Sequence, residues 1–105
     1  MADISYFNHV MELLEPIGNI SGRAMFGGYG IFHEGDMFAL VAGATLYFKV
    51  NETNRAAYQN AGSQQFKPMP YYEVPAEIME DTSLFHEWAR TAIAIGHATA
   101  KKKRQ

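Results

Sequence analysis

The sequence predicts an α+β fold, with helices in one layer and an antiparallel sheet of about five strands in the other. Two observations support this prediction. Apolar residues recur at helical spacing near both ends of the chain, from Phe7 to Leu14 and from Phe85 to Ile95. Between them, residues 45–50 alternate polar and apolar side chains, which is typical of a strand with one buried face. Short links between the strands favour antiparallel pairing. We therefore expect the element order α-β-β-β-α-β-β-α.

Composition narrows the class of protein. The chain has 105 residues, so we expect one domain over residues 1–105. It has no cysteine, which excludes disulfides and thiol catalysis. It shows no signal peptide and no apolar run of about 20 residues, so we expect a cytoplasmic protein with no membrane segment. The formal net charge of −2 makes direct DNA binding unfavourable, because phosphate contacts require a basic surface.

The chain closes with a short basic tail at about residues 100–105, where Lys101 to Arg104 are all cationic. We interpret it as a solvated tail whose charges complement the negative end of the preceding helix. The alternative is an arm that contacts nucleic acid or an acidic partner.

Taken in order, residues 3–15 predict a helix that Asp3 caps and Pro16 ends. The stretch 23–32 then combines an arginine, three aromatic residues and three glycines. Clustered glycines in a strand indicate a bulge or a sharp bend. We therefore predict one strand here, bent at Gly27 and Gly28.

The remaining elements follow from alternation and from turn residues. We expect strands at 37–42 and 45–50, a short helix at about 52–61 capped by Asn51, a short fourth strand at Phe66, a fifth strand at 71–74 between Pro70 and Pro75, and a connecting segment at 75–80. The last helix starts near Asp81, Thr82 or Ser83 and carries an apolar stripe. We predict that it packs across the sheet with Trp88 as a core anchor.

No pattern in the chain predicts catalysis. Gly27, Gly28 and Gly30 are followed by strand pattern, whereas a phosphate-binding glycine loop opens a helix. His33 could meet a helix histidine in space, but no pair of histidines has the spacing of metal ligands. The acidic residues near the start of the last helix are explained by capping. We expect no catalytic residue, no metal and no cofactor, and hence no enzyme.

Arginine and aromatic residues are enriched where proteins bind one another. On that basis we select eight candidate contact residues for a partner or ligand: Arg23, Phe26, Gly27, Gly28, Tyr29, Tyr71, Tyr72 and Glu73. The structural alternative is that Arg23 stacks on an aromatic ring or pairs with Glu34 or Glu73.

Several ordered motifs together resemble one family. They are Arg23-x-Met25 to Phe32, Met37 to Val41, Leu46 to Val50, Asn54-Arg55, Met69 to Pro75 and Glu87-Trp88-Ala89. The pattern is similar to the amino-terminal domain of the TfoX/Sxy family, regulators of natural competence (DNA uptake and transformation) in bacteria. The resemblance implies a secretion-chaperone-like α+β fold and action together with other transcription regulators. It supplies no catalytic residue.

We therefore expect a non-enzymatic regulatory protein that acts through protein contacts, in transcriptional regulation of competence. A transcription regulator is the expected partner, and a homodimer formed through a free strand edge is a further hypothesis. The alternative is a small-molecule-binding domain or minor enzyme, with a pocket between the sheet and the third helix lined by Arg23, Tyr29 and Tyr72.

Overall fold

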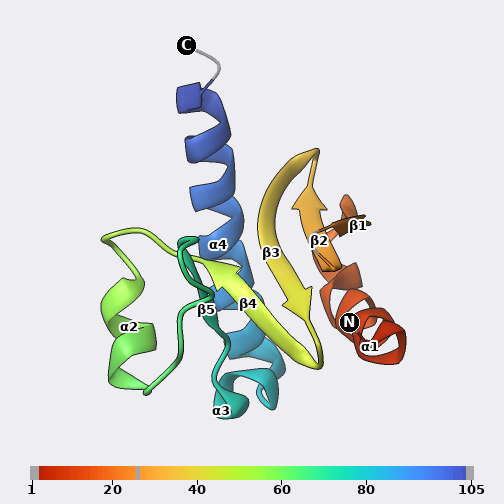
Figure 1. Ribbon diagram of the computed structural model, residues 1–105, viewed down its shortest axis with the longest axis horizontal. Coiled ribbons are helices and arrows are strands. Elements are labelled where there is room, and N and C mark those ends of the chain that lie inside the picture. Colours follow the sequence, from red (N-terminus) through yellow and green to blue (C-terminus); the bar gives the residue numbers. More distant parts are fainter. Residues whose placement is uncertain (1–2, 26, 104–105) are drawn as a thin grey trace.

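A computed structural model describes residues 3–25 and 27–103 (Figure 1). Its elements, in chain order, are α1 Ile4–Leu14, the 3-10 turn η1 Glu15–Ile17, β1 Ile20–Met25, β2 Gly28–His33, β3 Asp36–Ala42, β4 Thr45–Lys49, α2 Arg55–Asn60, β5 Tyr71–Glu73, α3 Ala76–Met79 and α4 Thr82–Lys103. The five strands form one antiparallel sheet in the order β1-β2-β3-β4-β5. This confirms the predicted α+β class with its five antiparallel strands.

One face of the sheet carries the core. Strand register places Ile31 beside Ala39, Ala39 beside Phe48, and Phe48 beside Tyr72, so these side chains share a face because residues directly opposite in a sheet do so. All four are buried in a single cluster that also includes Val10 and Leu14 of α1 and Phe85 and Ala92 of α4. The two long helices therefore form the second layer on this face. Figure 1 shows α1 beside β1 and β2, and α2 beyond β5 at the other side of the sheet.

The long helix α4 lies unusually close to β3. A Cβ built at Gly96 would lie 2.6 Å from the backbone carbonyl oxygen of Met37, so only glycine allows this approach. Asp81 accepts a hydrogen bond from the Leu84 amide at 3.0 Å, as expected of a cap at the start of α4. No helix in the described part of the chain combines the length and apolar character needed to cross a bilayer.

We predicted Trp88 as a core anchor, but it does not lie at the centre of the core. Phe85 takes that place with 1% exposure, its ring 5.6 Å from the ring of Phe48. Trp88 is half-buried and packs edge-on against Tyr58, at 4.7 Å between ring centroids. The cause is the direction of α4, whose central stripe of Phe85, Ala89 and Ala92 faces the sheet and turns Trp88 toward α2.

The prediction of one bent strand over residues 23–32 is wrong. The chain forms a hairpin instead, in which β1 already starts at Ile20 and Met25 pairs with Gly28. Gly27, with φ of 74°, lies in the connection, a conformation that glycine adopts without strain. The glycines thus reverse the chain rather than bend it.

The predicted fourth strand at Phe66 is reduced to one isolated bridge, between Gln65 and Tyr72. The chain reverses directly afterwards, since the Met69 amide donates to the Phe66 carbonyl at 2.9 Å, and a proline at 68 offers no amide to a ladder. Four strands therefore precede α2 and one follows it, where we expected three and two.

The two edges of the sheet differ. Beside β5, the Phe66 amide donates to the Tyr71 carbonyl and the Glu73 amide to the Gln64 carbonyl, so residues 64–66 cover that edge. Strand β1 pairs only with β2 and forms the other end of the sheet. The edge that remains for the hypothetical homodimer is thus β1 and not the proline-bounded β5. The homodimer itself stays a prediction.

Candidate functional site

The structure divides the predicted contact residues between the two faces of the sheet. Arg23 pairs with Gly30 and the adjacent Ala24 pairs with Tyr29, so Arg23 and Tyr29 point to opposite faces. Tyr29 stacks on Phe7 of α1 with 4.1 Å between ring centroids. The predicted pocket lined by Arg23, Tyr29 and Tyr72 is therefore not formed.

Arg23 has a local role that matches the structural alternative. Its side chain is exposed, and the guanidinium carbon lies 4.7 Å from the centroid of the Phe32 ring. Such a cation–π contact at an exposed site is worth roughly 0.5–1 kcal/mol. Arg23 therefore covers the apolar side chain of Phe32 on the face of the sheet away from α1 and α4.

Tyr71 and Tyr72 form no exposed patch. They are 2% and 8% exposed, and as neighbours in β5 they point to opposite faces. Burial raises the pKa of Tyr71 to about 12, and the Lys49 ammonium lies 5.0 Å from its ring centroid. Changing either tyrosine to alanine would disturb packing before it disturbed a contact with a partner.

The other predicted residues are also separated from one another. Gly27 is exposed in the β1–β2 connection, while a side chain at Gly28 would overlap the carbonyl oxygen of Val41. Glu73 is half-buried and lines a depression with Tyr6 at the far end of the sheet. Phe26 lies outside the described residues.

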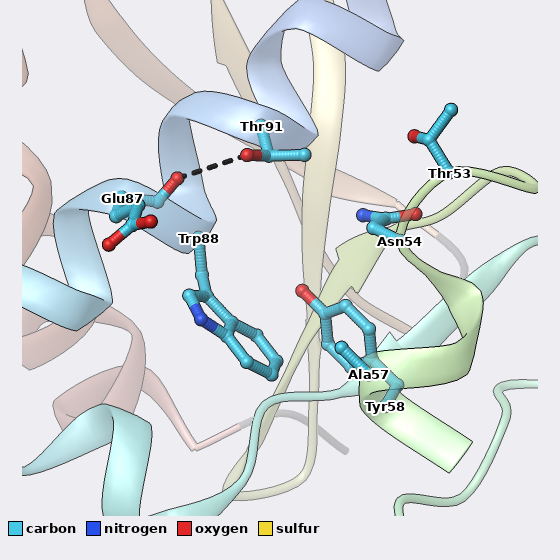
Figure 2. Close-up of a pocket in the computed structure, with 7 residues that line it drawn as sticks. All are labelled: Thr53, Asn54, Ala57, Tyr58, Glu87, Trp88 and Thr91. Carbon is cyan, nitrogen blue, oxygen red and sulfur yellow. Dashed lines mark hydrogen bonds between the residues drawn. The ribbon is translucent and has the colours of Figure 1, made fainter. Parts of the chain in front are cut away.

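A different surface brings functional side chains together, between α2 and α4 (Figure 2). We call it the α2–α4 groove. Its volume is about 240 Å³. The lining residues are Thr53, Asn54, Ala57 and Tyr58 from the α2 side and Glu87, Trp88 and Thr91 from α4.

Tyr58 is the unusual member of the groove. The residue is 1% exposed, yet its buried hydroxyl has no hydrogen-bond partner within the described structure. Figure 2 shows the hydroxyl at the end of the ring that faces Thr91 and Asn54. Burial raises the pKa of Tyr58 well above its ordinary value. An unpaired buried hydroxyl costs roughly 1–3 kcal/mol, so a partner atom supplied from outside would recover that free energy.

The rim of the groove is held by local hydrogen bonds. The Asn54 side-chain oxygen accepts from the Asn51 amide at 2.9 Å, and its amide nitrogen donates to the Lys49 carbonyl at 3.3 Å. These bonds tie the start of α2 to the end of β4. On α4, the Thr91 hydroxyl donates to the Glu87 carbonyl at 3.2 Å, which Figure 2 also shows. The chain's own hydrogen bonds therefore fix the rim of the groove.

The groove is smaller than most small-molecule pockets, and it contains residue types that are enriched at protein interfaces. Small-molecule pockets usually enclose about 300–1,000 Å³, more than the groove offers. A wider depression of about 640 Å³ lies over residues 62–67, but loop side chains such as Gln64 and Lys67 form most of its wall. The groove pairs a half-exposed tryptophan with a tyrosine, and these two residue types dominate binding energy at protein interfaces.

Sequence reasoning missed most of the groove, although two signals pointed to it. Trp88 is the single tryptophan, and Tyr58 is the aromatic side chain of α2, a helix of otherwise small or polar residues. Figure 1 shows α2 at the flank of the molecule. Nothing in the sequence indicated that Tyr58 and Trp88 would meet.

The fold and the groove define a small α+β domain with a groove between two of its helices. Comparison with known proteins then identifies its family. The model of the TfoX N-terminal domain matches residues 12–95, and the chain belongs to this family. The chain is also similar to the DNA transformation protein TfoX1 of Aliivibrio fischeri (strain ATCC 700601 / ES114), with 37% identity over 62 residues. That match covers 59% of this chain and 28% of the length of the relative.

Proposed function

We propose that this domain is a non-enzymatic regulator of DNA transformation, that it acts in transcriptional control of competence, and that it works by binding another protein. Two findings support the proposal: membership of the TfoX N-terminal domain family and similarity to a DNA transformation protein. The net charge of −2 agrees with action through a protein rather than directly on DNA.

The α2–α4 groove is the proposed contact surface, and the unpartnered Tyr58 hydroxyl is the observation that carries this choice. The expected occupant is a protein segment with an apolar side chain against Trp88 and a polar atom within reach of the Tyr58 hydroxyl. A transcription regulator is the expected class of partner. Hot-spot residues of this kind lose contact with water when a partner covers them, and energetically minor contacts around them keep water out.

The test uses two neighbouring alanines of α2. Both Ala56 and Ala57 are exposed, but only Ala57 lines the groove. Ala57→Arg fills the groove without changing the core, and Ala56→Arg adds the same charge and bulk beside it. The gene for each variant, and the wild-type gene, is introduced into a strain of the protein's own host from which the gene has been deleted. Transformation frequency with selectable DNA and transcripts of DNA-uptake genes are the readouts.

We expect deletion and Ala57→Arg to lower both readouts at least tenfold, and Ala56→Arg to restore them. A deletion that leaves transformation and transcripts unchanged would contradict the proposed function. Equal behaviour of the two arginine variants would leave a role in transformation standing but remove the groove as its surface. Circular dichroism of the purified variants controls for folding.

A further inference from the structure

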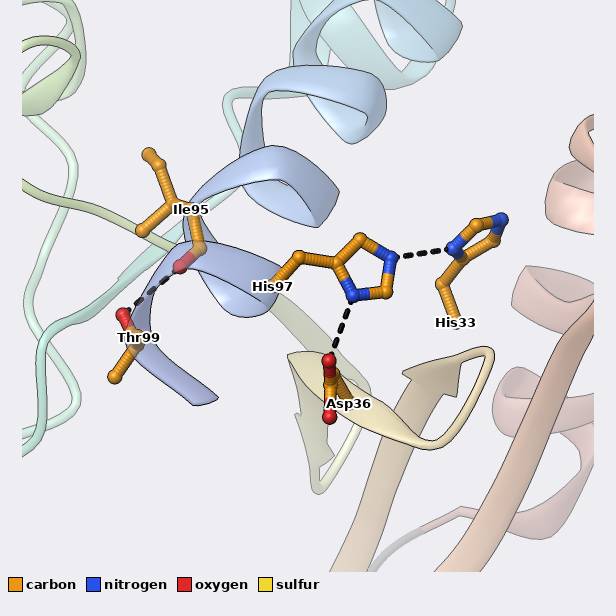
Figure 3. A network of polar contacts seen from close by, with 5 residues as sticks. All are labelled: His33, Asp36, Ile95, His97 and Thr99. Atoms are coloured by element: carbon orange, nitrogen blue, oxygen red, sulfur yellow. Dashed lines mark hydrogen bonds and ion pairs between the residues drawn. The ribbon is translucent and has the colours of Figure 1, made fainter. Parts of the chain in front are cut away.

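Three polar side chains, two from the β2–β3 hairpin and one from α4, meet beside the carboxyl-terminal half of α4 (Figure 3). His97 of α4 lies between the other two. Its Nε2 is 2.8 Å from Nδ1 of His33, the last residue of β2, and its Nδ1 is 2.7 Å from Oδ2 of Asp36, the first residue of β3. The spacing of the histidines along the sequence gave no sign of a ligand pair, because 64 positions separate them.

The β2–β3 turn places a carboxylate at the same point. His33 pairs with Asp36, and the two residues between them, Glu34 and Gly35, have φ values of 51° and 89°. Positive φ at both central positions is typical of a type I′ hairpin turn. Asn19 holds the turn, since its carbonyl accepts from the Glu34 amide at 3.1 Å. One ligand atom from each of His33, Glu34 and His97 lies within 4.8 Å of the others.

The carboxylate of Asp36 sets the proton on His97. A carboxylate accepts, so Nδ1 of His97 carries a hydrogen; in the neutral imidazole, the form that binds metal ions, Nε2 then presents its lone pair toward His33. When His97 is neutral and His33 carries its hydrogen on Nδ1, that N–H donates to the His97 lone pair. If His33 instead carries its hydrogen on Nε2, its Nδ1 lone pair and the Nε2 lone pair of His97 face each other across 2.8 Å.

We propose that this cluster binds a divalent transition-metal ion of the imidazole-preferring class, such as Zn²⁺, Ni²⁺ or Cu²⁺. Nδ1 of His33, Nε2 of His97 and the Glu34 carboxylate are the ligands. Asp36 is the outer carboxylate that orients His97, as carboxylates commonly do behind metal-bound histidines. With metal–nitrogen bonds of about 2.0 Å, nitrogens 2.8 Å apart subtend roughly 90°, as in square-planar or octahedral sites.

Charge and access both suit a cation. Imidazole binds a metal ion in its neutral form, so the two carboxylates of Glu34 and Asp36 would offset the charge of a bound divalent ion. The His97 side chain is 34% exposed and that of Asp36 is 16% exposed, so an ion can enter while the outer hydrogen bond stays sheltered. Two converging imidazoles with a carboxylate behind one of them distinguish the cluster from an ordinary group of surface acids.

Binding would join the β2–β3 turn to α4, and it can be measured without knowing the partner protein. The experiment is calorimetric titration of the untagged full chain, freed of metal by a chelator, with ZnCl₂, NiCl₂ and CuCl₂, and with MgCl₂ and CaCl₂ for comparison. We expect one transition-metal ion per chain and no saturable binding of Mg²⁺ or Ca²⁺, which prefer oxygen ligands. Histidine ring signals in NMR spectra should shift for His33 and His97.

Variants assign the ligands. His33→Ala and His97→Ala should each weaken binding more than 100-fold, and Asp36→Asn should weaken it roughly 10- to 100-fold, as loss of an outer carboxylate typically does. His9→Ala is the matched control, because His9 is exposed on α1 and is not a member of the cluster, and it should bind as wild type. Absence of one-to-one binding, or binding that persists in the His33→Ala/His97→Ala double variant, would overturn the proposal. NMR shifts of the wild-type protein keep the test decisive if a variant fails to fold.

Discussion

The two halves of α4 face polar groups that are satisfied to different degrees. In the first half, Trp88 and Thr91 face α2 across a groove whose buried Tyr58 hydroxyl has no partner. In the second half, His97 has a partner on each ring nitrogen. One helix thus carries an incomplete polar site at one end and a connected polar site at the other.

This difference indicates which kind of ligand would suit the groove and which would suit the His33–His97 cluster. If the groove binds a protein as proposed, its unpaired hydroxyl favours a partner that supplies the missing hydrogen bond and covers the Trp88 ring. A connected set of imidazoles and carboxylates is already oriented, so it suits a small charged ligand that replaces a proton. On the side of α4 that faces the sheet, Phe85, Ala92 and Gly96 anchor the helix and hold both ends in place.

The largest expected effect comes from removing the anchor in the first half of α4. Phe85→Ala deletes a side chain that is 1% exposed, and such changes cost about 3–5 kcal/mol. This is a large share of the roughly 5–15 kcal/mol that stabilises a domain. Leu84→Ala is the control, because Leu84 is the next residue and 38% exposed, and it should cost less than about 1 kcal/mol. Urea unfolding measures both, and equal losses would contradict the assignment of the core.

A smaller effect is expected where α4 approaches β3. Gly96→Ala places a methyl group 2.6 Å from the Met37 carbonyl oxygen, and backbone cannot move aside cheaply. Overpacking of this kind costs about 1–3 kcal/mol, which outweighs the gain of about 1 kcal/mol in helix propensity. We expect the melting temperature to fall by several degrees, whereas Ala94→Ser on the exposed side should leave it nearly unchanged. An increase in the melting temperature of Gly96→Ala would show that the helix lies further from the sheet.

The smallest effect is expected in the groove itself. Tyr58→Phe removes an unpaired hydroxyl, so stability at neutral pH should stay within about 1 kcal/mol of wild type or rise. At alkaline pH Tyr58→Phe should be more stable than the wild type. Burial raises the pKa of Tyr58 above the unfolded value near 10, so the native state loses stability as pH rises beyond about 10. Tyr71, with its pKa raised to about 12, adds to that loss in both proteins.

Chemical denaturation at neutral pH and at pH values above 10 compares the two proteins. A marked loss of stability in Tyr58→Phe at neutral pH would mean that the hydroxyl is hydrogen-bonded, and the contrast between the two ends of α4 would disappear.

Much of the fold is predictable because its signals are local. The helical spacing of Phe7 to Leu14, the Asp3 cap and the alternation in residues 45–50 predicted α1 and β4 correctly. The hairpin of β1 and β2 was missed because Ser21, Gly22 and Ala24 form an exposed edge strand with little apolar pattern. The bent-strand interpretation assigned the glycines to a bend when they make a turn.

The sites were less predictable than the fold. Arg23, Tyr29 and Tyr72 are aromatic or cationic and close in the predicted sheet, but a one-residue offset in register decides which face each one occupies. The residue types alone do not indicate the register in which the strands pair.

The order of residues determines the helices, the strands and the α+β class of this domain, because spacing, caps and turn residues act over a few positions. Only the folded chain brings Tyr58 to Trp88 and His33 to His97, since those pairs depend on how α4 crosses the sheet. That crossing is decided by packing over long sequence separations, with Gly96 against β3 as its closest point.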